Sequence, residues 1–258
     1  RYSSYLMDCH LRLNTISTYM RMLRCIYNRG VDMHQTPYVH RMFRDVFTGI
    51  DTRQKKAIPI NELHTLLNED PQSDKLRRTQ AIANLLFLFC GMPFVDLAYL
   101  EKSNLEGNML KYNRAKTGIP MNVEILDSAA TIISQLRNKH TTVLPEHPDY
   151  LFYILSGKNK RSDEAGYKEY QSALRCFNND LKSLARKLCI RSSVTSYTFR
   201  HSWATTAKYR GVPIEMISES LGHKSIKTTQ IYLKGFELSE RTKVNRLNYS
   251  YVMNFKTI

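Results

Sequence analysis

The chain has 258 residues, of which 42% are hydrophobic and 24% are charged. These fractions are close to those of folded proteins and exclude a disordered, collagen-like or fibrous chain, and the length indicates one large domain or two of unequal size. The net charge is +15, and residues 151–258 carry +11 of it, with 19 basic and 8 acidic side chains. This excess predicts a polyanionic partner such as nucleic acid, and a basic surface that only aids solubility is the alternative.

The cysteines are odd in number and widely scattered: Cys9, Cys25, Cys90, Cys176 and Cys189. This spacing argues against a disulfide framework and against a zinc site. No apolar run approaches the length of a membrane span, and the first residues do not form a signal peptide. We therefore expect a cytoplasmic protein with no membrane partner. Because the chain starts at Arg1 rather than Met, we expect a fragment or a processed form.

The first predicted element is a helix over residues 14–30, with Ile16 and Met20 on its apolar face and Gly30 as its stop. Arg21 and Arg24 lie on the opposite face, where they either contact DNA phosphates or form an ordinary exposed surface. Turn residues, a basic cluster and a proline follow, so we expect a linker at 51–58 between a first domain (1–50) and a second domain (59–258).

The second domain is predicted to be mainly helical with one small antiparallel sheet. Helices are expected at 60–67, 79–89, 171–188, 196–211 and 213–223, and the helix at 79–89 is apolar nearly all round, which predicts a central position. Strand-like residues at 109–113 and 120–125 flank a turn and predict a hairpin. Glycines are expected to close the helices at 196–211 and 213–223.

Two strings in the basic last third carry the most specific signal: TSYTFRHSWAT at 195–205 and SLGHKSIKTTQIYL at 220–233. They resemble the carboxyl-terminal signature of the tyrosine recombinase, or phage integrase, family. That signature reads His-x-x-Arg, then Leu-Gly-His, then a nucleophilic tyrosine nine residues after the second histidine. Arg200, His223 and Tyr232 stand at these positions in this chain.

The resemblance extends backward along the chain. Lys116 corresponds to the lysine of the family's β-hairpin, and Asp96 corresponds to an acidic residue that follows a central helix. Residues 1–50 resemble the end of the family's helical core-binding domain. The resemblance therefore covers roughly residues 14–235 and is strongest at 195–233. It is closest to integrases of mobile genetic elements of bacterial type, and it implies that the beginning of the core-binding domain and any arm-binding domain are missing.

The residue types suit attack on a phosphodiester without a metal ion. The sequence shows no carboxylate constellation for magnesium, so fixed cations have to stabilise the negative charge that develops on the phosphate oxygens. Arg200 can form a fork to two oxygens and His223 can donate to one. The resemblance implies that Tyr232 is the nucleophile, and a phosphotyrosine keeps the energy of the broken DNA bond. It also implies that Lys116 protonates the departing 5′ oxygen, which contributes on the order of 10²- to 10⁴-fold.

Taken singly, each of these four residues also has a purely structural interpretation, and their joint order and spacing favour the catalytic one. The implied function is site-specific cleavage and rejoining of double-stranded DNA during integration or excision of a mobile element. The resemblance further implies that the active form is a homotetramer on two duplexes and that the free protein is a monomer. It implies accessory DNA-bending proteins as possible partners, and no cofactor.

The chain departs from the family pattern at two positions. The family's first arginine is absent, because Pro93 or Cys90 occupies its place, depending on the subgroup form used for alignment. Tyr197 replaces the first histidine, and its hydroxyl can still hydrogen-bond a phosphate. Arg114 is the candidate substitute arginine, because alternation along a strand would place it on the same face as Lys116.

The absent arginine leaves a second class of function open, a DNA-binding relative that lacks catalytic activity. A type IB topoisomerase, which uses the same chemistry on one duplex, is a further alternative that the GHKSIKTTQIY string argues against.

Overall fold

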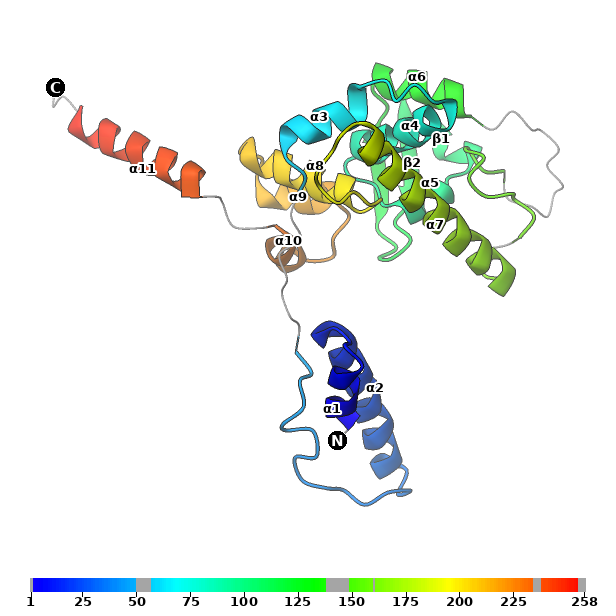
Figure 1. The fold of residues 1–258 in the computed structure, drawn as a ribbon, viewed down its shortest axis with the longest axis vertical. Helices are drawn as coiled ribbons and strands as arrows, with labels where there is room; N and C mark the ends of the chain where they lie inside the picture. The colour runs from blue at the N-terminus through cyan, green and yellow to red at the C-terminus, as the bar shows by residue number, and fades with distance from the viewer. Residues whose placement is uncertain (1, 50–56, 138–148, 160, 234–237, 255–258) are drawn as a thin grey trace. The chain divides into compact units, whose positions relative to one another are not determined.

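The structure is a computed structural model that divides into two compact units, residues 1–54 and residues 55–258, and each unit is treated by itself (Figure 1). The residues described are 2–49, 57–137, 149–159, 161–233 and 238–254. The expected linker at 51–58 lies mostly outside this set.

The first unit contains a short helix, α1 (Tyr2–Asp8), and a long one, α2 (Leu13–Asp32). Its small core consists of Leu6, Ile16 and Met20, with Val46 packed against it. Helix α2 continues past the predicted stop at Gly30. The left-handed residue that ends it is His34, with φ of +53°, and the amide of the next residue, Gln35, donates to the Gly30 carbonyl.

Residues after α2 are fastened to it through Tyr27. The Tyr27 hydroxyl donates to the Pro37 carbonyl (3.1 Å) and accepts from the Val39 amide (2.6 Å), and its ring lies 5.8 Å from that of Phe43. Ser17 donates to the Gly49 carbonyl further along. These bonds hold a non-helical segment against α2.

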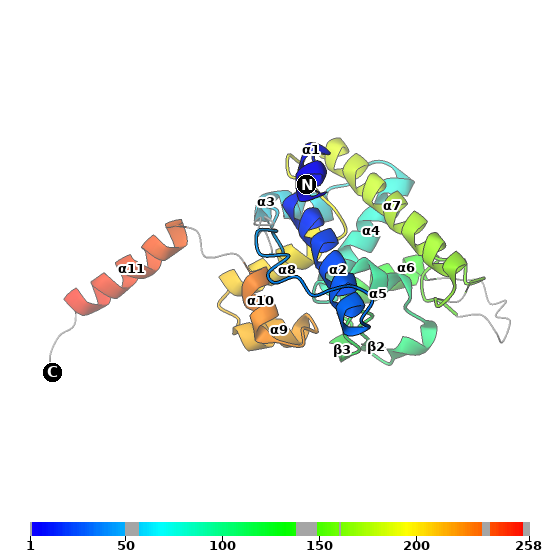
Figure 2. The same ribbon diagram turned by 90° about the horizontal axis from the view of Figure 1, so that it is seen from below.

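The second unit is built around helix α4 (Asp74–Leu88), which contacts α6 (Asp127–Leu136), α7 (Glu164–Lys187) and α8 (Thr198–Tyr209) (Figures 1 and 2). Leu85 and Leu86 of α4 are fully buried, in agreement with the predicted central position. Helix α3 (Ile60–Asn68) also packs on α4. Helix α7 starts at Glu164, whereas the sequence predicted a start near 171. The prediction missed the first turns because they are polar and largely exposed and lack apolar periodicity.

The sheet has three antiparallel strands in the order β1 (Leu105–Glu106), β2 (Met109–Asn113) and β3 (Pro120–Glu124). The predicted hairpin is present, with Tyr112 opposite Met121. Strand β1 was not predicted, since two residues cannot show an alternating pattern. A short helix, α5 (Phe94–Ala98), and a 3-10 turn, η1 (Lys102–Asn104), precede the sheet.

The last helices are α9 (Ile214–Ser220), α10 (Ile226–Tyr232) and α11 (Leu238–Met253). Ala204, Ile217, Leu221 and Leu233 form a small second core that joins α8, α9 and the end of α10. Gly211 and Gly222 follow α8 and α9 in left-handed conformations, as predicted. Helix α11 was not predicted, and its described side chains are largely exposed. The mainly helical fold with a small antiparallel sheet is confirmed. No helix in the described ranges is long and apolar enough to cross a membrane.

Candidate active site

Arg200, on the first turn of α8, is held in place by two loops. It is only 2% exposed. Its Nη1 atom donates to the Gly91 carbonyl (2.9 Å), and its Nη2 atom donates to the Leu221 carbonyl (2.5 Å) and contacts His223 Nε2 (3.0 Å). The loop after α4 and the loop after α9 thus meet on one guanidinium group. This arrangement fixes the direction of the charge before any substrate arrives.

The loop after α4 can approach Arg200 because it contains a glycine. Gly91 has φ of +68°, and a Cβ atom built there would lie 2.9 Å from Arg200 Cα. The preceding residue, Cys90, also has positive φ (+54°). Cys90 is half-buried, and burial raises the pKa of its thiol, which argues against a thiolate nucleophile.

Asp96 and Arg114 form a buried ion pair beside this loop. Arg114 Nη1 donates to Asp96 Oδ2 (2.5 Å), and Asp96 Oδ1 accepts from the Ala115 amide (2.9 Å). The Asp96 side chain is fully buried and that of Arg114 is 6% exposed. The Arg114 Nε atom is a buried donor with no hydrogen-bond partner among the described residues.

The prediction that strand alternation places Arg114 and Lys116 on the same face is wrong. Strand β2 ends at Asn113, and a turn follows in which the Gly118 amide donates to the Arg114 carbonyl. Alternation therefore does not apply, and Arg114 is buried whereas Lys116 is exposed. The turn nevertheless brings both cations near His223, because both charges contribute to lowering its pKa.

The hairpin turn packs directly on the loop that carries His223. Thr117 donates to the Gly222 carbonyl (3.2 Å). Gly222 has φ of +62°, and a Cβ atom there would lie 2.7 Å from Arg114 Cγ and 2.8 Å from Met121 Sδ. The glycine of the Leu-Gly-His string is therefore needed for this close approach.

His223 lies at the centre of the cationic cluster. Burial, followed by the charges of Arg200, Arg114 and Lys116, lowers its pKa to about 4. The imidazole is therefore neutral at pH 7 in the free protein. The Nδ1 atom lies 2.8 Å from the hydroxyl of Thr229, which is fully buried on α10.

Sequence reasoning missed Thr229 as a partner of His223. The available signal was its place in the KTTQIY string, one helical turn before Tyr232. Tyr232 is the last residue of α10, and its side chain lies outside the described residues. Tyr197, in the place of the family's first histidine, is 40% exposed, and its ring lies edge-on to the ring of His201 at 5.0 Å.

The described residues contain no group of three His, Cys, Asp or Glu side chains able to hold a metal ion. The clustered groups in the second unit are instead the cations Arg200, Arg114 and Lys116 around a neutral histidine. Such a cluster can bind an anion and stabilise negative charge that develops on it.

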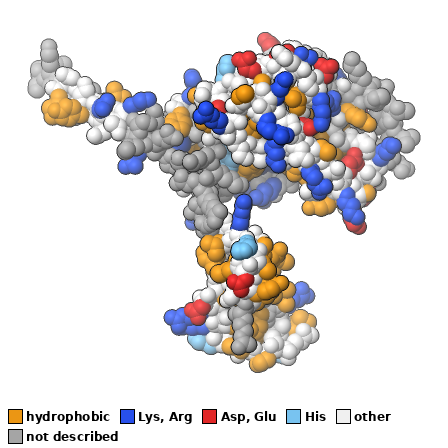
Figure 3. All heavy atoms as spheres, viewed as in Figure 1, with side chains coloured by type: hydrophobic (Ala, Val, Ile, Leu, Met, Phe, Trp, Pro, Cys, Tyr) orange, Lys and Arg blue, Asp and Glu red, His pale blue; other side chains and the backbone are white. Residues whose placement is uncertain are grey.

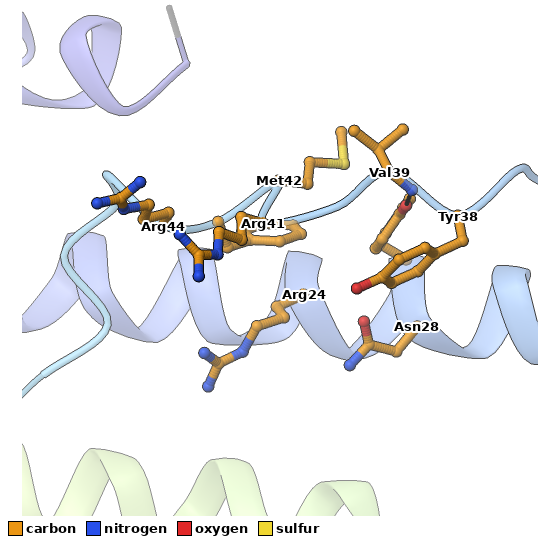
Figure 4. Close-up of a pocket in the computed structure, with 9 residues that line it drawn as sticks. Arg24, Asn28, Tyr38, Val39, Arg41, Met42 and Arg44 are labelled. Atoms are coloured by element: carbon orange, nitrogen blue, oxygen red, sulfur yellow. Dashed lines mark hydrogen bonds between the residues drawn. The ribbon is translucent and has the colours of Figure 1, made fainter.

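The first unit has a separate basic pocket of about 570 Å³ between α2 and the segment that Tyr27 fastens. Arg24, Arg41 and Arg44 line it together with Tyr38 and Asn28 (Figure 4). Arg24 therefore belongs to a cluster of basic side chains. Arg21 lies outside the pocket and donates hydrogen bonds within its own helix, to the Ser17 carbonyl and the Thr18 hydroxyl.

In the second unit, Lys and Arg side chains are spread over the face drawn in Figure 3.

Comparison with known proteins defines the class to which this fold and site belong. Residues 56–237 match the model of the phage integrase family. The chain therefore belongs to the phage integrase family of tyrosine recombinases, and the resemblance found in the sequence is confirmed.

Two curated relatives and one solved structure illustrate the match. Tyrosine recombinase XerA of Pyrococcus furiosus is 30% identical over 195 residues, which are 75% of this chain and 62% of XerA. Tyrosine recombinase XerD of Listeria monocytogenes is 24% identical over 226 residues, 84% of this chain and 70% of XerD. This chain thus spans about two thirds of each relative's length.

The solved structure is that of the Tn1549 transposon integrase in complex with transposon right end DNA. It matches with a TM-score of 0.63 and 13% identity, and the match covers 96% of this chain and 83% of that one. At this identity the likeness shows a shared fold.

Proposed function

We propose that this chain is a site-specific DNA recombinase that cleaves and rejoins double-stranded DNA through a 3′-phosphotyrosine intermediate. The observation that carries the proposal is the placement of Arg200 against His223, 3.0 Å apart, at the start of the segment that leads through α10 to Tyr232. The Tn1549 integrase bound to DNA and the Xer recombinases support DNA as the substrate.

In the first step, the Tyr232 hydroxyl loses its proton to solvent and its oxygen attacks the phosphorus, so that a Tyr–O–P bond forms and the bond from phosphorus to the 5′ oxygen breaks. Arg200 and His223 stabilise the charge on the nonbridging oxygens. Lys116, on the exposed hairpin turn, donates the proton that converts the departing oxygen into a 5′-hydroxyl. In the second step, the 5′-hydroxyl of a partner strand gives its proton to Lys116, its oxygen attacks the phosphotyrosine, and the released Tyr232 takes up a proton from solvent.

Arg114 supplies the second guanidinium in place of the family's absent arginine. It is buried next to His223, it is anchored by Asp96, and its Nε donor has no partner among the described residues. A buried donor without a partner calls for an explanation. We infer that Arg114 Nε donates to a phosphate oxygen of bound DNA after a local adjustment of the hairpin turn. In this assignment Asp96 is the acid that positions Arg114, and Tyr197 stands ready to hydrogen-bond the phosphate.

The remaining parts of the proposal concern assembly. The first unit, residues 1–50, acts as part of a core-binding domain that grips DNA through its arginines. Two rounds of strand exchange through a Holliday junction require four copies on two duplexes. The biological role is integration or excision of a mobile element.

The proposal is tested with nicked suicide substrates made from the ends of the element that encodes the protein. Wild-type protein is expected to form a covalent protein–DNA adduct, and Tyr232→Phe is expected to form none while binding DNA with nearly unchanged affinity. Tyr167→Phe, an exposed tyrosine on α7, is the matched control and should form adduct normally. Adduct from Tyr232→Phe would refute the assignment of the nucleophile.

One specific observation, the absence of arginine at both Cys90 and Pro93, favours a second candidate function. In that case the chain binds DNA without cutting it. Binding of element-end DNA with no adduct from the wild-type protein would select this candidate. Relaxation of supercoiled DNA by a monomer would instead indicate a type IB topoisomerase.

A further inference from the structure

The hydrogen bonds around His223 define the position of its ring proton in the free protein. Nε2 lies 3.0 Å from Arg200 Nη2, and Nδ1 lies 2.8 Å from Thr229 Oγ1. A guanidinium group has only donors, so Nε2 must accept from Arg200. A neutral imidazole carries one proton, which is therefore on Nδ1 and is donated to the Thr229 hydroxyl.

The hydrogen bond to His223 Nε2 also uses one of the hydrogens of Arg200 Nη2. Nη2 has two hydrogens, and among the described residues it donates to the Leu221 carbonyl (2.5 Å) and to His223 Nε2 (3.0 Å). Nη2 can therefore donate to a phosphate oxygen only when one of these acceptors is released. Leu221 belongs to the buried backbone between α8 and α10, whereas the His223 ring is partly exposed. His223 is the acceptor that can be released.

The charges that face His223 favour the neutral ring. Arg200 reaches it from α8, and Arg114 and Lys116 reach it from the hairpin turn. Asp96 lies behind Arg114 and is paired with it. Burial and these three cations lower the pKa of His223 to about 4. An anion between the ring and the cations would have the opposite effect on this pKa.

We propose that Thr229 is a positioning residue that holds His223 as the Nδ1–H tautomer, so that Nε2 keeps Arg200 until a DNA phosphate displaces the ring and His223 takes up one proton. The displaced Nε2 faces a phosphate oxygen, and two acceptors repel each other unless Nε2 is protonated. The solvent supplies this proton, and Nδ1–H remains bound to Thr229. This inference rests on the proposed function, because it assumes that the anion at this site is the scissile phosphate.

The first test measures the tautomer in the free protein at pH 7 from imidazole ¹⁵N resonances of histidine-labelled protein. The His223 signal is assigned by its loss in His223→Gln. We expect a protonated Nδ1 and an unprotonated Nε2 in the wild type and in Thr229→Ser, which keeps the hydroxyl. Thr229→Val removes the acceptor, so Nδ1–H loses its partner and the ring is no longer held with Nε2 against Arg200. This variant is expected to shift both His223 resonances toward a mixture of tautomers.

The control is Thr228→Val, because Thr228 is the exposed neighbour on α10. It should leave the His223 signals unchanged. A proton on Nε2 in the free wild-type protein, or a Thr229→Val spectrum like that of the wild type, overturns the proposal. The wild-type spectrum decides the question even if Thr229→Val fails to fold.

The second test adds sulfate, an anion that does not titrate in this range, and follows the His223 resonances as the pH is varied. The pKa of His223 is expected to rise by about one unit or more, the scale of a neighbouring opposite charge. A pKa that does not change with sulfate contradicts the proton uptake. Adduct formation by a protein with the wrong tautomer would refute only this inference, and the predicted tautomer in a protein that forms no adduct would refute only the proposed function.

Discussion

The two units of the chain are built differently. The second unit buries a continuous apolar core around α4 and holds its charged groups in a dense cluster where two glycines permit contacts that a Cβ would block. Within residues 2–49, the described part of the first unit, three apolar side chains are buried, and arginines and many apolar residues are exposed, including Met22 and Ile26 on α2. Phosphoryl transfer needs groups fixed within a fraction of an ångström, whereas a grip on the DNA backbone mainly needs positive charge. Changes in the second unit should therefore alter rate, and changes in the first unit should alter affinity.

The largest effect is expected from Arg114→Gln, which should slow adduct formation by roughly 10²-fold, the scale seen when one transition-state donor is lost. DNA affinity should fall far less. Arg114→Lys should recover only part of the rate, because an ammonium group keeps the charge but lacks the planar fork. Single-turnover cleavage of suicide substrates measures these rates.

Loss of Arg114 also leaves the buried Asp96 carboxylate unpaired, which costs about 3 to 5 kcal/mol of stability. The double variant Arg114→Gln/Asp96→Asn removes this charge and should recover stability in urea unfolding without recovering the rate. Lys111→Gln, an exposed cation on the same hairpin, is the control and should leave both unchanged. Normal cleavage by a folded Arg114→Gln protein would show that Arg114 is only a structural ion-pair partner.

A smaller effect, on stability, is expected from Gly91→Ala. The new Cβ would lie 2.9 Å from Arg200 Cα and the residue would keep positive φ, so left-handed strain and overpacking add to about 3 kcal/mol. Gly107 has a similar φ with nothing within 4 Å of a built Cβ, and Gly107→Ala should therefore cost about 1 kcal/mol from strain alone. Equal losses for the two variants in urea unfolding would contradict the close packing of this loop on Arg200.

The sequence was sufficient for the family, the fold class and the hairpin, because these depend on local spacing and periodicity. The string from Leu221 to Tyr232 and the apolar pattern of residues 79–89 are both legible without a structure. The start of α7 could not be predicted from the sequence, because its first turns are polar and show no apolar pattern. These turns are helical because the packing of the later turns stabilises the whole helix.

The contacts within the site depend on tertiary structure and could not be read from the sequence. The ion pair between Asp96 and Arg114 joins residues 18 apart, and the bond from Arg200 to Gly91 joins residues 109 apart. Thr229 lay in a recognised string, yet its bond to His223 needs the three-dimensional path of the loop before α10. The roles of these residues in catalysis stay predictions.

In the first unit, replacing Arg24, Arg41 and Arg44 by Gln should weaken DNA binding and reduce its salt dependence. Each lost phosphate contact lowers the slope of log affinity against log salt by about 0.9, so three contacts lower it by about 2.7. The cleavage rate of bound DNA should not change. Arg29→Gln is the control, since Arg29 lies on the same helix outside the pocket. A triple variant with wild-type affinity and slope would remove this pocket from the DNA interface.

The smallest effect concerns the pH dependence of stability in the second unit. The pKa of His223 is about 4 in the folded protein, below the ordinary value of 6.5, so the unfolded chain binds the proton first as the pH falls. The contribution of the neutral ring to stability is therefore complete above pH 6.5 and is lost as the pH falls toward 4. Because the ring is only half-buried, the loss of stability is on the order of 1 kcal/mol.

Urea unfolding at pH 7 and pH 5 should show a larger loss of stability for the wild type than for His223→Gln. The pKa values of Glu62 and Glu169 are also lowered, but their effect falls below pH 4.5 and is shared by both proteins. Equal losses in the two proteins would show that the cations around His223 do not keep its ring neutral.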